Sequence, residues 1–94
     1  MLNAVKLAMR PAIKTNAYDG ELRDLIDAAK ADLKRVGIVG DESDPLIRQA
    51  IKTYCRLHFG SPADAEKLER SYNTQVGSLM GSGKYRNWGD LNGA

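Results

Sequence analysis

Residues 45–60, PLIRQAIKTYCRLHFG, decide the fold of this chain. At about 100° per residue, one half of the helix that they predict is covered by mainly apolar and aromatic side chains. These are Leu46, Ile47, Ala50, Ile51, Tyr54, Cys55, Leu57 and His58. Arg48, Lys52 and Arg56 recur every fourth residue on the other half and form a line of positive charge. Such a helix packs on more than one neighbour and keeps a charged edge, which indicates a scaffolding or assembly component.

Two helix-start signals of the same kind bound this stretch, Asp44-Pro45 and Ser61-Pro62. In each, a side chain that can cap a helix precedes a proline at the first helical position. They predict one helix over about 45–59 and a second over about 62–80. In the second helix the core-facing side chains fall within an arc of about 80°. These are Ala65, Leu68, Tyr72, Val76 and Leu79.

The first half of the chain predicts one long helix and one short helix. The long helix covers about 20–36, with Asp19 as its cap, Gly37 after its end, and acids early and bases late along its length. The short helix covers about 2–10 and is stopped by Pro11. No strand-type alternation of useful length is present. We therefore expect an all-α bundle as a single domain over 1–80, followed by a flexible C-terminal tail over 81–94.

Composition limits the class of protein further. A chain of 94 residues makes one domain with modest stability on its own, and oligomerisation is a common way for so short a chain to bury more surface. A net charge of +2 is too mild to predict nucleic-acid binding by itself. The single cysteine excludes an intrachain disulfide, and neither a membrane-spanning run nor a signal peptide is recognisable. We expect synthesis in a cytoplasm.

No group of residues predicts catalysis. The stretch Gly81-Ser82-Gly83-Lys84 lacks the remaining positions of a phosphate loop and follows a helix instead of a strand. Cys55 and His58 offer only two metal ligands, and Cys55 is interpreted as a small buried side chain. The sequence therefore predicts a protein that is not an enzyme, with no catalytic, cofactor-binding or metal-binding residues.

Two sets of residues are candidate contact surfaces. Arg48, Lys52 and Arg56 form either an ordinary solvated face or a surface for DNA phosphates or an acidic partner. The tail residues Lys84, Tyr85, Arg86 and Trp88 combine cations with aromatic rings. We favour docking on a neighbouring subunit for this tail over stacking on bases or a plain disordered end.

Several stretches, in their order and spacing, resemble the head–tail connector proteins of long-tailed double-stranded-DNA bacteriophages and prophages. They are Val5–Arg10, Leu25–Leu33, Asp44–Ile51, Tyr54–Gly60, Leu68–Tyr72 and Lys84–Arg86. The resemblance implies a head-completion adaptor of the virion, made in the host cytoplasm. It would form a ring of about a dozen copies. This ring would lie under the portal protein, extend the channel for passing DNA without specific contacts, and dock the next neck or tail-completion protein.

The alternative function is a small DNA-binding regulator. The two helices predicted around Gly60-Ser61-Pro62 loosely resemble a helix-turn-helix. The second helix, however, begins Ala63-Asp64-Ala65-Glu66, which would bring acids against phosphates.

Overall fold

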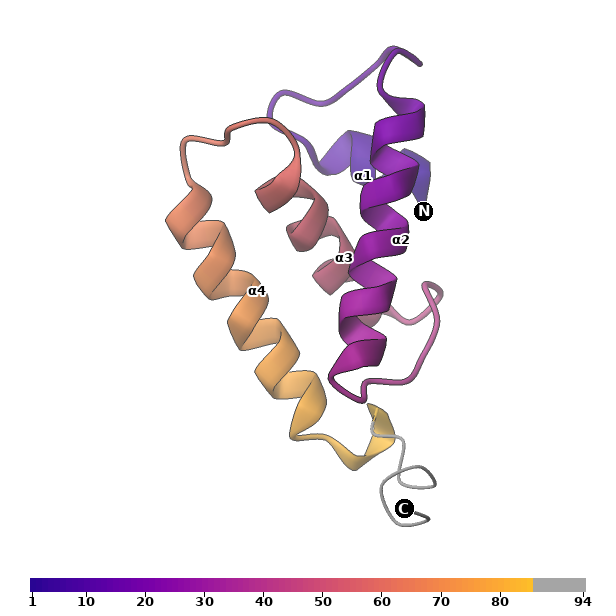
Figure 1. The fold of residues 1–94 in the computed structure, drawn as a ribbon, viewed down its shortest axis with the longest axis vertical. Helices are drawn as coiled ribbons and strands as arrows, with labels where there is room; N and C mark the ends of the chain where they lie inside the picture. The colour runs from indigo at the N-terminus through magenta and orange to yellow at the C-terminus, as the bar shows by residue number, and fades with distance from the viewer. Residues whose placement is uncertain (86–94) are drawn as a thin grey trace.

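The computed structural model describes residues 1–85, and their regular structure is helical (Figure 1). Its elements are α1 (Leu2–Ala8), α2 (Asp19–Arg35), α3 (Pro45–His58), α4 (Ala65–Met80) and a 3₁₀ turn, η1 (Gly83–Tyr85). The prediction of an all-α bundle with three main helices and a short N-terminal helix is confirmed.

Helix α3 lies at the centre of the bundle. It packs against α1, α2 and α4, and Figure 1 shows it between α2 and α4. Its side chains Ala50, Ile51 and Cys55 are completely buried, together with Leu22 of α2 and Val5 of α1. Burying a side chain such as Ile51 or Leu22 contributes about 1.5–3 kcal/mol relative to leaving it in water. Three neighbouring helices thus cover most of the apolar half of α3, while Leu46 and His58 on that half stay exposed.

The start of α3 is capped as its sequence predicts. The Asp44 carboxylate accepts hydrogen bonds from the backbone N–H groups of Leu46 (2.9 Å) and Ile47 (3.3 Å), and Pro45 occupies the first turn. Desolvation alone would raise the pKa of Asp44. The amide bonds and a hydrogen bond from the Tyr85 hydroxyl outweigh it, so that the pKa is lowered.

The end of α2 also follows its sequence signal. Gly37 adopts φ +87°, its N–H donates to the Lys34 carbonyl at 3.0 Å, and the N–H of Ile38 donates to the Leu33 carbonyl at 3.0 Å. This pair of bonds is a Schellman motif, and the accompanying apolar residues Leu33 and Ile38 are both buried.

The start of α4 differs from the prediction. The helix begins at Ala65 instead of Pro62, and Asp64 is its N-cap residue without a side-chain cap bond. Asp64 directs its carboxylate to Arg56 of α3 instead, at 3.6 Å. The apolar stripe of α4 also begins only at Ala65. An extra helical turn over residues 62–64 would therefore bury no further apolar side chain in the core.

Smaller differences occur in the first half of the chain. Helix α1 ends at Ala8, two residues early, and α2 begins at Asp19 with Tyr18 at its N-cap position. Asp19 therefore does not cap α2. Its carboxylate lies 2.9 Å from Nζ of Lys6, a buried lysine on α1, and this ion pair joins the two helices.

Candidate functional site

The line of positive charge on α3 is divided among three environments. Arg48 is exposed, and its Nε donates to the carbonyl of Glu42 at 3.1 Å. Arg56 is half-buried, and its Nη2 lies 3.6 Å from Oδ2 of Asp64. Lys52 is half-buried between them and forms no ion pair or hydrogen bond with any residue of 1–85. The three cations do share one helix, but only Lys52 and Arg56 face the same hollow.

That hollow lies between α1 and α3 and has a volume of about 370 Å³. We call it the basic groove; it is lined by Ala4, Leu7, Ala8, Arg10, Gln49, Lys52 and Arg56. Among residues 1–85, the Arg10 side chain forms hydrogen bonds only with main-chain carbonyls, with Nη1 3.1 Å from the oxygen of Ala8 and 3.3 Å from that of Met9. Leu7 at the same groove is 64% exposed. The groove thus combines two cations of α3 and Arg10, which follows α1, with an exposed apolar side chain.

Our reading of the sequence did not place Arg10 or Leu7 in this surface. The sequence contains one indication of a basic surface near the N-terminus, because the first fourteen residues include Lys6, Arg10 and Lys14 and no acid. The structure separates these three cations. Lys6 is buried against Asp19, Arg10 enters the basic groove, and Lys14 is exposed.

The N-terminal half of α2 carries the opposite charge. We call Glu21, Asp24 and Asp27 the acidic face; all three are exposed, and none forms an ion pair or hydrogen bond within the part of the chain that the structure describes. At 100° per residue they lie on the side of α2 away from its buried residues Leu22 and Ile26. The acidic face therefore points away from the bundle.

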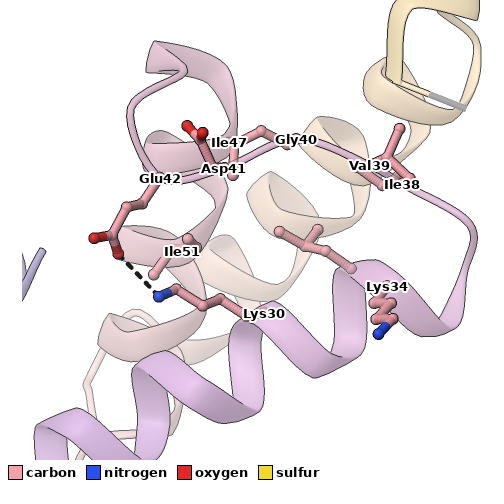
Figure 2. A pocket seen from close by; sticks show the side chains of 10 residues that line it. Lys30, Lys34, Ile38, Val39, Gly40, Asp41, Glu42, Ile47 and Ile51 are labelled. Carbon is pink, nitrogen blue, oxygen red and sulfur yellow. Dashed lines mark ion pairs between the residues drawn. The ribbon is translucent and has the colours of Figure 1, made fainter.

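Another hollow, of about 480 Å³, lies between α2 and the loop that leads into α3 (Figure 2). Ile38, Ile47 and Ile51 contribute apolar surface to it. Figure 2 shows Lys30 reaching toward Glu42, where an ion pair of 3.0 Å links α2 to the loop. Both of these charged side chains are exposed, so the pair ties the loop to the helix with little gain in stability. No cluster of chemically reactive groups lines this hollow.

The predicted docking residues of the tail are separated by the structure. Tyr85 is buried in the core, its main-chain carbonyl accepts a hydrogen bond from the N–H of Val39, and its hydroxyl lies 3.0 Å from Oδ2 of Asp44. The structure thus places Tyr85 in the core of the subunit, and its docking role stays a prediction. Lys84 is exposed, with Nζ 3.6 Å from Asp44 Oδ2. Arg86 and Trp88 lie outside the described residues.

Cys55 and His58, the two residues considered for catalysis or metal binding, lie in different environments. Cys55 is completely buried, and burial raises the pKa of its thiol to about 12. His58 is exposed and packs on Tyr54, with 4.2 Å between the ring centroids. Among residues 1–85 no group of three or more histidine, cysteine or carboxylate side chains is placed to hold a metal ion. Within the same residues, no helix has the length and apolar character needed to cross a bilayer.

Comparison with known proteins adds a family to this geometry. A family model described as phage connector protein matches residues 1–86, which is most of the chain. No curated protein and no solved structure matches the chain. The match covers every described helix, including the central α3 with its capped start. The chain belongs to the phage connector protein family.

Proposed function

We propose that this protein is a head–tail adaptor subunit that forms a ring under the portal of a phage or prophage particle. The ring extends the channel through which DNA passes and presents a platform for the next neck or tail-completion protein. The role is structural and not catalytic. Membership in the phage connector family carries this proposal, because it indicates contacts with other head or tail proteins and a place in the virion.

The exposed apolar side chains support an assembled state. Leu7 is 64%, Leu46 58% and Tyr18 47% exposed, and they project from different parts of the bundle. Single exposed apolar residues are common in monomers. Leu46 lies on the apolar half of α3, at a position that the neighbouring helices leave uncovered. Contacts between subunits would remove these side chains from water, which a small domain achieves only partly by itself.

Electron microscopy of the purified protein, alone and with portal rings, tests the proposal. We expect ring-shaped density on one face of the portal, and weaker binding by Leu46→Ser than by the control Thr74→Ser, which changes an exposed polar site on α4. A protein that stays monomeric at high concentration and also fails to bind portal would contradict the proposal.

The structure does not favour the alternative of a sequence-specific DNA-binding regulator. Residues 59–64 connect α3 to α4, a longer link than the three or four residues of a helix-turn-helix. The helix that would read bases also has Asp64 at its N-cap position and Glu66 in its first turn. Sequence-selective retention of a DNA duplex in a gel shift would restore this alternative.

A further inference from the structure

We propose that the basic groove of one copy binds the acidic face of α2 on the next copy. This inference rests on the proposed function, because it names the two surfaces through which adaptor subunits would join. It places Arg10 and Lys52 of one subunit against Asp24 and Asp27 of its neighbour.

The first support is that the groove holds uncompensated positive charge. Among residues 1–85, the half-buried Lys52 lacks a partner, and Arg10 contacts main-chain carbonyls but no carboxylate. Arg56 borders the same groove and has a carboxylate at 3.6 Å. Like charges in one hollow repel each other, and an acidic occupant would relieve that repulsion.

The second support is that the acidic face has the matching composition. Its three carboxylates have no cationic partner within residues 1–85. On the helical wheel Ala28 and Ala31 lie between them, so the face has small apolar positions among its acids. Such positions let another surface approach closely and can receive the exposed side chain of Leu7. Phosphates of DNA would neutralise the groove but would leave Leu7 in water.

The placement of the two surfaces decides how they can pair. The acidic face lies on the side of α2 opposite its buried residues, while α1 and α3, which form the groove, pack on the bundle side of α2. One molecule therefore cannot close its own groove with its own acidic face. A contact between two different surfaces of identical copies is head-to-tail, and it generates a ring when the rotation between subunits closes.

Charge exchange between two variants tests the contact. The groove variant carries Arg10→Glu and Lys52→Glu, and the face variant carries Asp24→Lys and Asp27→Lys. Each alone would bring like charges together at every contact. An equimolar mixture would restore opposite charges at both kinds of contact, provided that the two variants alternate.

We expect each variant alone to need a concentration about tenfold or more above that of the wild type for half-assembly, and the mixture to recover most of this loss. Sedimentation velocity with and without portal rings measures this. The matched control is Lys67→Glu with Arg70→Glu, which makes the same charge change on exposed residues of α4 and should assemble like the wild type. Circular dichroism confirms folding, and Arg10→Gln with Lys52→Gln replaces the groove variant if it unfolds.

Assembly of the groove variant at wild-type concentrations would overturn this contact while leaving the adaptor proposal in place. If that variant also lost retention of a DNA duplex, the occupant of the groove would be phosphate. A mixture that fails to recover assembly while the wild type assembles would likewise overturn it. A wild-type protein that assembles neither alone nor on portal would overturn the adaptor proposal itself, and the contact with it.

Discussion

The hydroxyl of Tyr72 lies 2.6 Å from Oδ2 of Asp32, and this hydrogen bond joins α4 to α2 across forty residues of sequence. The bond from Tyr72, assisted by Arg35, lowers the pKa of Asp32 against a smaller opposing effect of burial. Burial and the same hydrogen bond raise the pKa of Tyr72. The bundle thus contains a charge-assisted hydrogen bond between its two outer long helices, on top of its apolar core.

This bond predicts a pH-dependent effect of Tyr72→Phe. Because the folded-state pKa of Asp32 is below its ordinary value of 3.8, its stabilising contribution is present above that value and is lost as pH falls through the folded-state pKa. We expect Tyr72→Phe to lower the free energy of unfolding by about 1 kcal/mol near neutral pH, since Asp32 is partly exposed, and by less in acid. Urea unfolding over a pH series measures the difference. Tyr54→Phe is the control, because its hydroxyl forms no hydrogen bond with any of residues 1–85. Equal and pH-independent losses in both variants would contradict the prediction.

The buried ion pair between Lys6 and Asp19 predicts that α1 depends on it for docking. Lys6→Met would leave the Asp19 carboxylate, which is 20% exposed, without its cation. We expect a loss of about 1–2 kcal/mol, below the value for a fully buried pair because Asp19 keeps some contact with water. Thermal or urea unfolding checks this, with Lys14→Met as an exposed control on the same segment. A double variant, Lys6→Met with Asp19→Asn, should lose less than the sum of the single losses; strict additivity would show that the two residues are not coupled.

Gly37 and Gly77 allow a matched comparison of two glycine-to-alanine substitutions. A Cβ at Gly37 or at Gly77 would meet no atom within 4 Å, but only Gly37 has a positive φ, +87°. We therefore expect Gly37→Ala to destabilise the protein by about 1 kcal/mol, because the Schellman motif needs that backbone conformation. Gly77→Ala, inside α4, should stabilise it by about 0.5–1 kcal/mol. Unfolding midpoints that shift in the same direction for both variants would refute this assignment.

Cys55 should react slowly in the folded protein. Its thiol is completely buried, and the rise of its pKa to about 12 keeps it protonated at neutral and mildly alkaline pH. We expect labelling by a disulfide reagent to be limited by unfolding and to become fast and stoichiometric in denaturant. A cysteine introduced at exposed Ser71 in a Cys55→Ala background gives the rate for an accessible thiol. Rapid labelling of native Cys55 would show that the centre of the bundle opens readily.

Sequence patterns located the helices because their signals are local. The apolar spacing of α3, the cap at Asp44 and the glycine after α2 each act within one or two helical turns, and the structure contains all three. The Ser61-Pro62 signal failed at α4, since Asp64 bonds to Arg56 on another helix and the apolar stripe begins only at Ala65. A long-range contact also explains Asp19, whose carboxylate pairs with Lys6 of α1 and does not cap α2.

The sequence by itself determined an all-helical bundle built around residues 45–58 and a resemblance to phage connectors. The helical bundle and the resemblance can both be recognised from the spacing and order of residues along the chain, without knowledge of long-range contacts. The tertiary structure decided which charges share a surface. It brought Arg10 beside Lys52, directed Glu21, Asp24 and Asp27 outward, and buried Tyr85 against Asp44. These placements join residues far apart in the chain, and only the packing of α1, α2 and the C-terminal turn around α3 fixes their distances.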